Sequence, residues 1–168
     1  MSAKSPSSRR TCFYAGETYD MAESMGHLLF HLVMNVKREV DDRMTELDLT
    51  DAQWKPLWML KVGRADTAFE LAREMSIDAG AMTRMLDRLA AKGLIERVRS
   101  ETDRRVVHLR LTPEGHAAAD RIPHVLADVN NDFLRGFSKA EWQQLKEYLQ
   151  RMRANGEALQ SNSSEETT

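Results

Sequence analysis

Residues 94–115, with the sequence LIERVRSETDRRVVHLRLTPEG, contain two short runs of alternating apolar and polar side chains separated by a charged turn. The runs 94–99 and 106–111 alternate in the way that half-buried strands do. A hairpin that carries Arg104 and Arg105 near its tip is poorly suited to filling a core. It is well suited to reaching a narrow, negatively charged groove, so the stretch predicts an arginine-tipped wing.

Directly upstream of the hairpin, apolar periodicity predicts two short helices, over 68–75 and 78–92. Asp78 is placed to cap the second helix, and Gly93 is placed to end it in the left-handed conformation. Two such helices followed by a hairpin are typical of a winged helix–turn–helix. We expect this lobe to span residues 48–112 and to bind double-stranded DNA.

Longer helices are predicted on both sides of the lobe, over 21–47 and within 113–159. In a single chain they have no large core of their own, so we expect a homodimer in which these N- and C-terminal dimerisation helices interlock. The predicted fold class is therefore mainly α with a small β-wing. Residues 1–20 are expected to form a flexible N-terminal extension, and residues 160–168 a disordered tail.

Capping signals place the starts of the last two helices. Thr112 opens a helix that is expected to run to about residue 134. Ser138 with Glu141 has the pattern of a capping box, in which each residue satisfies a backbone N–H group of the other.

Composition limits the classes of function. The 168-residue chain has a net charge of −2, but residues 78–112 hold eight Lys/Arg against five Asp/Glu, a local balance of +3. This suits a protein that touches DNA with one face. A single cysteine, Cys12, allows no internal disulfide, and no run has the apolar length that a bilayer requires, so we expect a cytoplasmic protein without a membrane anchor. The chain has no phosphate-binding glycine loop, zinc-protease helix or nucleophile elbow, so neither an enzyme nor a cofactor is expected.

The second helix of the predicted helix–turn–helix has the features of a recognition helix. Small residues at its leading end allow the backbone to approach the major groove, and donors follow on one face, opposite an apolar face. Asp103 is expected to hold a neighbouring arginine extended by an ion pair. An ordinary amphipathic surface helix and a solvated charged hairpin are the alternatives. The predicted DNA-contacting residues are Ala79, Ala81, Thr83, Arg84, Arg88, Arg99, Asp103, Arg104 and Arg105.

At this point the chain resembles the MarR family of bacterial transcriptional regulators. The resemblance rests on residues 82–97, MTRMLDRLAAKGLIER, on Asp103-Arg104-Arg105 and on 111–115, LTPEG, and it covers roughly residues 25–158. It implies a homodimeric repressor on a pseudo-palindromic operator, with wing arginines in the minor groove. It also implies release from DNA by a small ligand, often a phenolic or aromatic acid, or by oxidation of a cysteine.

The resemblance also implies a place for the ligand, in the crevice between the dimerisation helices and the DNA-binding lobe. An aromatic acid needs flat apolar walls and a cation or hydrogen-bond donor. Methionine and tryptophan at helical spacing also fill cores, which is a second interpretation of the same pattern. The candidate ligand-binding residues on the first two helices are His27, His31, Met34, Arg38, Trp54 and Trp58.

Three further hypotheses stay open. His27 and His31 have the i, i+4 spacing of metal ligands, which would make the protein a metal-responsive regulator. Cys12 lies close to Arg9 and Arg10, which favour the thiolate, so a redox-responsive regulator is the second hypothesis. A module that docks a protein instead of DNA is the third.

Overall fold

The computed structural model describes residues 11–103 and 106–165 of the chain. The described part is mostly helical, with one two-stranded antiparallel sheet, which confirms the predicted fold class. In chain order the elements are η1 (Gly16–Thr18), α1 (Met25–Thr45), α2 (Asp51–Lys61), α3 (Ala68–Met75), α4 (Ala79–Ala91), β1 (Ile95–Arg99), β2 (Val107–Leu111), α5 (Pro113–Phe133) and α6 (Lys139–Glu165).

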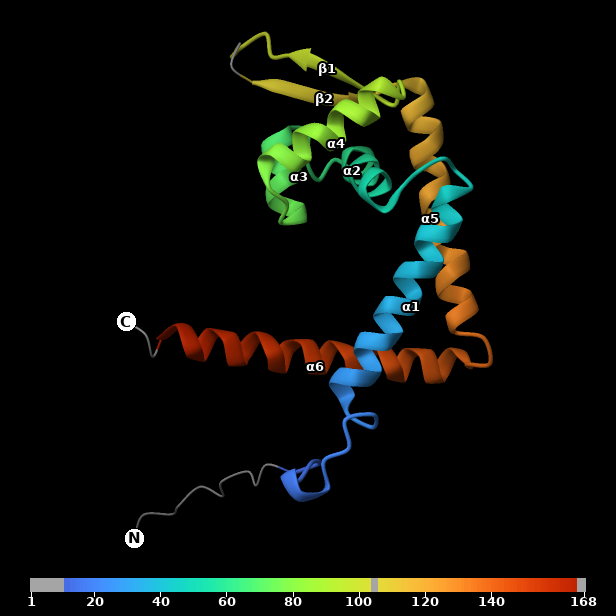
Figure 1. The fold of residues 1–168 in the computed structure, drawn as a ribbon, viewed down its shortest axis with the longest axis vertical. Helices are drawn as coiled ribbons and strands as arrows, with labels where there is room; N and C mark the ends of the chain where they lie inside the picture. Colours follow the sequence, from blue (N-terminus) through green and yellow to red (C-terminus); the bar gives the residue numbers. More distant parts are fainter. Residues whose placement is uncertain (1–10, 104–105, 166–168) are drawn as a thin grey trace.

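The helices divide the molecule into a lobe and a stalk (Figure 1). α2, α3, α4 and the β-hairpin form the lobe at one end. α1 and α5 pack against each other along the stalk, and α6 lies across its far end. α6 makes few contacts with the rest of the described chain, although it is the longest helix there. None of the helices in the described residues is both long and apolar enough to cross a bilayer.

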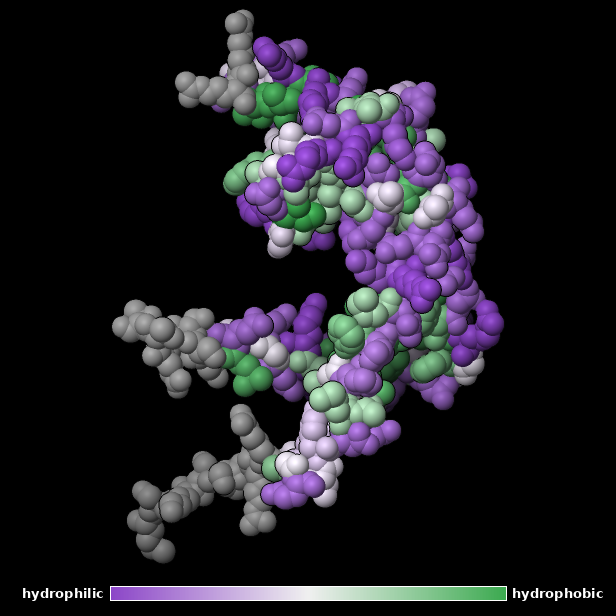
Figure 2. All heavy atoms as spheres, viewed as in Figure 1, coloured by the Kyte–Doolittle hydropathy of each residue, from purple (hydrophilic) through white to green (hydrophobic). Residues whose placement is uncertain are grey.

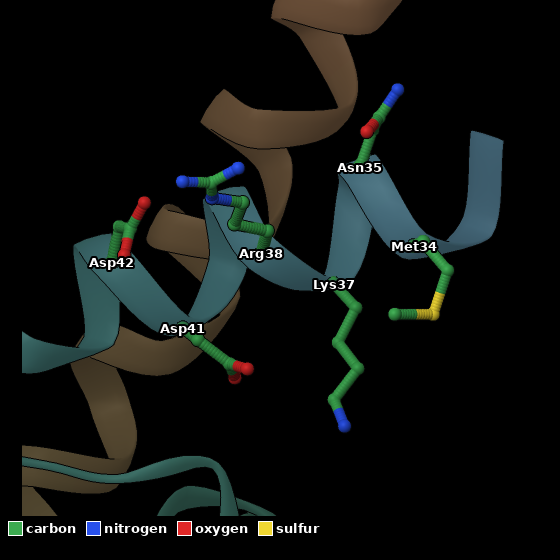
Figure 3. Close-up of a pocket in the computed structure, with 6 residues that line it drawn as sticks. All are labelled: Met34, Asn35, Lys37, Arg38, Asp41 and Asp42. Atoms are coloured by element: carbon green, nitrogen blue, oxygen red, sulfur yellow. The ribbon is translucent and has the colours of Figure 1, made fainter. Parts of the chain in front are cut away.

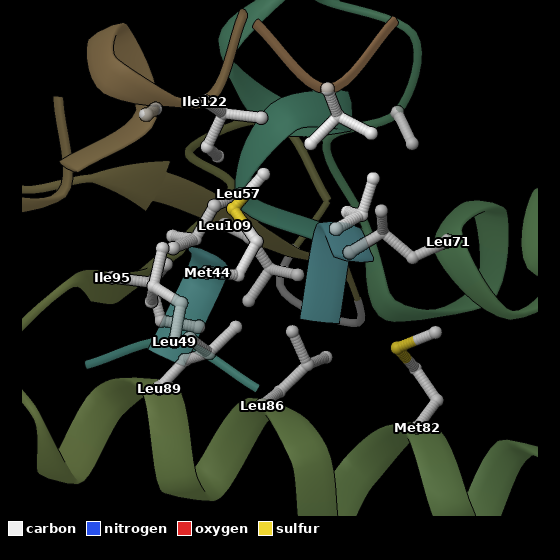
Figure 4. Close-up of a cluster of buried hydrophobic side chains, with 14 residues drawn as sticks. Met44, Leu49, Leu57, Leu71, Met82, Leu86, Leu89, Ile95, Leu109 and Ile122 are labelled. Atoms are coloured by element: carbon white, nitrogen blue, oxygen red, sulfur yellow. The ribbon is translucent and has the colours of Figure 1, made fainter. Parts of the chain in front are cut away.

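The core of the lobe also includes the near ends of both stalk helices (Figure 4). Met44 of α1 and Ile122 of α5 are fully buried among side chains of the lobe. Because these close-packed residues come from both parts, neither stalk helix can shift at its near end without disturbing the lobe core. The lobe residues of this cluster that Figure 4 labels are Leu49, Leu57, Leu71, Met82, Leu86, Leu89, Ile95 and Leu109.

The hairpin joins α5 at a tight connection. β1 and β2 pair from Ile95 opposite Leu111 to Arg99 opposite Val107. Thr112, the N-cap of α5, donates its hydroxyl to the carbonyl of Gly93 over 2.6 Å and its N–H to the carbonyl of Leu94 over 3.1 Å. The same hydroxyl accepts the N–H of Gly115 over 3.0 Å. These bonds fix the direction in which the stalk helix leaves the wing.

The predicted capping signals are present. The carboxylate of Glu141 accepts the N–H of Ser138 over 2.7 Å, and the Ser138 hydroxyl accepts the N–H of Glu141 over 3.2 Å. Gly93 has a φ of 70°, as expected of a residue that ends a helix in the left-handed region. Local hydrogen bonding therefore decides where these helices begin and end.

The ends of the chain differ from the prediction. α6 continues to Glu165, so the expectation that residues 160–165 belong to a disordered tail is wrong; no glycine or proline follows Gly156 to end the helix. α1 begins at Met25, four residues later than predicted, because the Ser24 hydroxyl caps it by accepting the N–H of His27 over 3.3 Å. Ahead of it, the Tyr14 hydroxyl accepts the N–H of Met25 over 2.9 Å. Residues 11–24 therefore include an ordered cap of α1.

Gly115 provides a test of the tight connection. A Cβ at this position would lie 1.8 Å from the carbonyl oxygen of Leu94, which is backbone and cannot move aside. We expect Gly115→Ala to lower the free energy of unfolding by about 2–3 kcal/mol, as overpacked core positions do. Urea denaturation measures this change.

The control is Gly156→Ala in α6, where a Cβ would meet nothing within 4 Å. Alanine in a helix interior should raise stability there by about 0.5–1 kcal/mol. Equal effects of the two substitutions would contradict the assigned role of Gly115.

Candidate nucleic-acid interface

The start of α4 is held by a side-chain cap. The Asp78 carboxylate accepts the N–H of Gly80 over 2.9 Å and the N–H of Ala81 over 3.0 Å. Between α3 and α4, Ser76 takes the left-handed conformation, with a φ of 52°, which turns the chain sharply. The leading end of α4 is therefore fixed relative to α3, as a helix–turn–helix requires.

The two faces of α4 are distributed as predicted. Met82, Leu86 and Leu89 are fully buried in the lobe core, and Met85 packs against them. Thr83, Arg84 and Arg88 are exposed on the other side, as is Ala79 at the leading end, whereas Ala81 is half-buried.

Arg84 lies over the start of its own helix. Its Nη1 atom is 3.6 Å from the point where a Cβ of Gly80 would be. Thr83 donates its hydroxyl to the carbonyl of Ala79 over 2.9 Å, which leaves the hydroxyl oxygen free to accept a further hydrogen bond. α4 thus presents small residues, a hydroxyl and two guanidinium groups on one accessible surface, the set that base edges and phosphates require.

Arg84 and Arg88 also border a hollow of about 210 Å³ beside the first turn of α2. Thr50, Ala52 and Gln53 form its other wall. The N-terminus of a helix carries partial positive charge, but the first turn of α2 also holds the Asp51 carboxylate, so the two arginines supply the positive charge that borders this hollow. A DNA phosphate has the charge that such a place attracts.

The wing contributes Arg99 at the end of β1, where the side chain is exposed. Its turn is closed by the Ser100 hydroxyl, which accepts the N–H groups of Thr102 over 3.3 Å and of Asp103 over 3.2 Å. Arg104 and Arg105 lie outside the described residues, so their predicted contacts and the ion pair expected for Asp103 stay predictions.

Two basic residues of this region are already engaged within the fold. Arg97 donates to Asp87 over 2.7 Å and joins β1 to α4, and Lys92 lies 3.0 Å from a carboxylate oxygen of Asp48. Sequence reasoning missed the first pair, because its members lie ten positions apart on different elements.

The candidate ligand-binding residues do not meet in one place. Met34 and Arg38 border a hollow of about 450 Å³ on the surface of α1, which Figure 3 shows with Asn35, Lys37, Asp41 and Asp42. Trp54 borders a separate cavity, and Trp58 packs against the core. His27 and His31 border neither of these two cavities; their rings contact each other, with centroids 4.3 Å apart.

The cavity that includes Trp54 is the more apolar of the two. Its volume is about 430 Å³, and it lies among α1, α2 and α5. The indole Nε1 of Trp54 is buried and has no hydrogen-bond partner within the described residues. Sequence reasoning did not identify the apolar walls, because they form only when α1 packs against α5. The lining residues are Leu32, Val33, Val36, Lys37, Val40, Asp51, Trp54, Lys55 and Leu126.

Charged groups at this cavity are coupled. The Asp51 carboxylate lies 2.6 Å from the Lys55 ammonium and 3.5 Å from that of Lys37. Burial works to raise the pKa of Asp51, but the two lysines outweigh it and lower the pKa. The pKa of Asp41 is raised, first by burial and then by the charge of Asp51. One carboxylate oxygen of Asp41 is buried without a hydrogen-bond partner in the part of the chain that the structure describes.

The surroundings of His27, His31 and Cys12 bear on metal and redox sensing. Among residues 11–103 and 106–165, no group of three or more His, Cys, Asp or Glu side chains is placed to hold a metal ion, around His27 and His31 or elsewhere. The side chain of Cys12 is exposed.

Asp41, which borders the hollow on α1, provides a test of the electrostatic arrangement around Asp51. Because its pKa is raised in the folded state, folding favours its protonated form, and that stabilisation is lost as the pH rises through the folded-state pKa. We expect Asp41→Asn to raise the Tm at neutral pH by about 1–2 °C, a small gain because the group is partly solvated. The gain should shrink as the pH falls into the range where the Asp41 carboxyl is itself protonated.

Asp42→Asn, at the exposed neighbouring position, is the matched control and should leave the Tm nearly unchanged. Thermal unfolding followed by circular dichroism over a series of pH values makes the comparison. A lower Tm for Asp41→Asn at neutral pH would refute the assignment.

Comparison with known proteins identifies relatives over most of the chain. The model of the MarR family matches residues 49–107. The multiple antibiotic resistance protein MarR of Escherichia coli (strain K12) is 35% identical over 123 residues, which are 72% of this chain and 85% of that protein. The crystal structure of the reduced form of E. coli MarR has a TM-score of 0.69 at 30% identity and covers 77% of this chain and 96% of its own. A mutant of E. coli MarR solved in complex with operator DNA has a TM-score of 0.66 at 29% identity, covering 80% and 99% of the two chains.

Proposed function

Because this chain belongs to the MarR family of transcriptional regulators, we propose that it is a homodimeric repressor that binds a pseudo-palindromic operator and is released by a small aromatic or phenolic acid. The observation that carries the proposal is the exposed face of α4, where Thr83, Arg84 and Arg88 stand opposite the buried core residues and beside a wing. The similarity to E. coli MarR in complex with operator DNA supports this use of the surface.

In the proposed complex, α4 enters the major groove. Ala79 and Ala81 let the helix backbone come close to the base edges, and Thr83 and Arg84 contact bases or phosphates. Arg88 lies one turn further along the same face and reaches the phosphate backbone. The wing lies over the adjacent minor groove, where negative potential is concentrated. It contacts this groove through Arg99, Asp103, Arg104 and Arg105.

The distribution of apolar side chains supports the homodimer. α6 is long and finds few neighbours in its own chain, and a helix without tertiary packing is marginal in water. Figure 2 shows apolar side chains gathered over α1 on the face toward the viewer. Patches of this kind on a folded chain mark interaction surfaces. The exposed apolar residues of the two helices include Met25, Leu28, Phe30, Leu32, Val33 and Met34 on α1, and Trp142, Tyr148, Leu149 and Leu159 on α6.

A two-fold dimer would present two copies of α4 to one duplex. Both half-sites can be bound only when the two helices are separated by about one turn of DNA, roughly 34–36 Å. The operator is then expected to be pseudo-palindromic, since each half-site meets the same protein surface.

The DNA interface can be tested with Arg88→Ala. If Arg88 contacts a phosphate, the variant should bind duplexes of all sequences more weakly, and the slope of log affinity against log salt should fall by about one. Arg84→Ala should cost about 1–3 kcal/mol on the preferred duplex and relax its base preference. Fluorescence anisotropy with duplexes from the region upstream of the gene measures both effects.

Arg153→Ala on α6 is the control, because its side chain is exposed and lies on the helix at the far end of the stalk. The double change Arg104→Ala and Arg105→Ala tests the wing in the same assay. Unaltered affinity and salt slope in the α4 variants would exclude α4 as the reading helix. If the wild-type protein bound no duplex, a role in docking another protein would be favoured.

We place the effector in the apolar cavity of about 430 Å³ among α1, α2 and α5. Leu32, Val36 and Leu126 offer apolar walls for a ring, and the unpartnered Trp54 indole can donate a hydrogen bond to an oxygen of the ligand. Lys37 and Lys55 border the cavity and pair with Asp51, so the carboxylate of an aromatic acid would share these ammonium groups with Asp51. Of the six residues predicted from the sequence, this placement keeps Trp54 and leaves His27, His31, Met34, Arg38 and Trp58 outside the cavity lining.

The position of the cavity suggests how binding lowers operator affinity. It is bordered by both stalk helices and by the first helix of the lobe, so its occupancy favours one relative placement of stalk and lobe. A ligand that binds best when the two copies of α4 are wrongly spaced weakens DNA binding by its differential affinity for that state.

Trp54→Phe tests this placement, because it keeps an aromatic wall and removes the indole N–H. With 2-hydroxybenzoate as the probe, about fivefold more ligand should be needed to release the operator, as expected for one lost hydrogen bond. Trp58→Phe is the matched control and should respond like the wild type, because Trp58 packs on the core instead of bordering the cavity.

A larger effect of Trp58→Phe than of Trp54→Phe would contradict the placement. Release by peroxide, lost in Cys12→Ser, would favour a redox-responsive regulator. Release by Zn²⁺, lost in His31→Ala, would favour a metal-responsive one.

A further inference from the structure

An apolar hollow lies between the first turn of α3 and the outer end of the hairpin. Its volume is about 400 Å³, and Thr67 is the polar residue of its wall. Figure 2 shows hydrophobic surface beneath the outer end of the hairpin, beside the hydrophilic surface of α4. The lining residues are Thr67, Ala68, Phe69, Val106 and Val107.

Phe69 is the most accessible wall of this hollow. Its side chain is 74% exposed, although Leu71 of the same helix is fully buried. Phe69 neither belongs to the hydrophobic core nor packs against it. A ring that stays in water adds little to the stability of the fold, so its surface is available to a partner.

The two walls of the hollow are held by hydrogen bonds. At the start of α3 the Thr67 hydroxyl accepts the N–H of Glu70 over 3.2 Å, and the Glu70 carboxylate accepts the N–H of Thr67 over 3.3 Å. In the hairpin the carbonyl of Val106 accepts the N–H of Ser100 over 3.0 Å, and the N–H of Val106 donates to the carbonyl of Asp103 over 2.9 Å. The hollow is therefore formed before a partner binds, which lowers the entropic cost of binding.

The hairpin turns its apolar face toward the rest of the lobe at this point. Side chains alternate along β2, so Val107 projects from the same face as Leu109, which is buried in the lobe core. Val107 lies beyond the end of that core and is 38% exposed. The hollow is thus open on the side of the wing that faces α3 and α4.

A guanidinium group lies at the edge of the hollow. Arg99 is directly opposite Val107 in the register of the hairpin, and cross-strand partners project from the same face about 5 Å apart. The side chain of Arg99 is exposed. The surface therefore combines apolar walls with a cation beside them.

The acids nearest to the start of α3 already have partners. Asp66 lies 3.0 Å from Nδ1 of His108, which projects from the other face of β2. The carboxylate of Glu70 accepts the N–H groups of Asp66 and Thr67. Arg99 therefore supplies the charge that an anion meets at the edge of the hollow.

We propose that this hollow binds the sugar–phosphate backbone of the DNA duplex, with Phe69 and Val107 packed on a deoxyribose and Arg99 on the adjacent phosphate. The inference rests on the proposed function, since the backbone reaches the hollow only if α4 and the wing bind one duplex. With α4 in the major groove and the wing in the minor groove, the strand between the two grooves passes between them. That strand alternates apolar sugar faces with anionic phosphates, as the hollow and Arg99 require.

The dimensions of the hollow favour DNA over other occupants. A stable protein–protein interface buries about 800 Å² on each partner, which five side chains do not provide. A small aromatic ligand needs a pocket that encloses most of its surface, whereas Phe69 leaves this hollow open. A backbone strand needs only a matching strip of surface, because its other side stays in the duplex.

Phe69→Ala tests the contact on a duplex that the wild-type protein selects from random sequence. The affinity should fall about three- to tenfold, as expected when partial burial of an aromatic ring is lost. The slope of log affinity against log salt and the base preference should both stay unchanged, because a sugar contact releases no counterion and reads no base. The Tm should also stay unchanged, because the ring is exposed in the free protein.

Two further variants separate the apolar contact from other effects. Phe69→Leu keeps most of the apolar area and should bind within about twofold of the wild type. Val62→Ala is the control, because Val62 is an exposed apolar residue of the lobe that lies outside the hollow, at the end of α2. It should leave affinity unchanged.

Photocross-linking identifies the occupant directly. A benzophenone inserts into nearby C–H bonds on irradiation, and deoxyribose offers such bonds. The full chain with p-benzoylphenylalanine in place of Phe69 should yield a protein–DNA adduct with the selected duplex. The same group in place of Val62 should yield no DNA adduct.

The outcomes separate the two proposals. If Arg88→Ala weakens binding but Phe69→Ala and the cross-link show no contact, the inference is wrong and the proposed function stands. A changed salt slope or base preference in Phe69→Ala would also overturn it, since the ring would then act through a phosphate contact or through α4. An adduct between two protein chains in place of one with DNA would assign the hollow to a second copy. If the wild type selects no duplex, both proposals fail.

Discussion

The close approach of the first turn of α5 to the carbonyl of Leu94 is the constraint on which the rest of the structure depends. At this point α4 has just ended, β1 begins, β2 has ended and α5 starts. Gly115 makes room for the carbonyl, and Thr112 binds the carbonyls of Gly93 and Leu94. A rotation of α5 must therefore carry the wing and the end of α4 with it, since no flexible linker separates them.

The hydrophobic core also joins the stalk to the lobe. Met44 and Ile122 bring both stalk helices into the hydrophobic cluster of the lobe, so the near half of the stalk and α4 form one packed body. The apolar cavity lies beside this body, among α1, α2 and α5. Small changes in side-chain packing at this cavity are transmitted to α4 through the close-packed core. Such side chains shift between discrete arrangements instead of deforming smoothly.

Sequence reasoning succeeded where the deciding interactions are local. Asp78, Thr112 and Ser138 cap helices within a few residues of themselves, so their patterns placed α4, α5 and α6 to within a residue at the start. It failed at the far end of α6, where polar composition was read as a tail although nothing interrupts the helix.

Tertiary contacts left no such signal in the sequence. The cavity needs Leu126 of α5 beside Val36 of α1, and the link of Asp66 to His108 joins positions 42 residues apart. The effector residues proposed from the first two helices alone could not include these partners. Trp54 is the residue of that predicted set that borders the cavity, whereas the aliphatic walls have no feature in the sequence that distinguishes them from core residues.

Because α6 makes few contacts within its own described chain, the stability of the protein is tied to its concentration in the cell. If this helix completes its packing only in a second chain, then each molecule gains stability from encountering another, and its melting temperature depends on concentration. At low abundance the unassembled subunit exposes the apolar side chains of α6 to proteases and chaperones. The fraction of assembled protein would then rise with the amount that the cell makes.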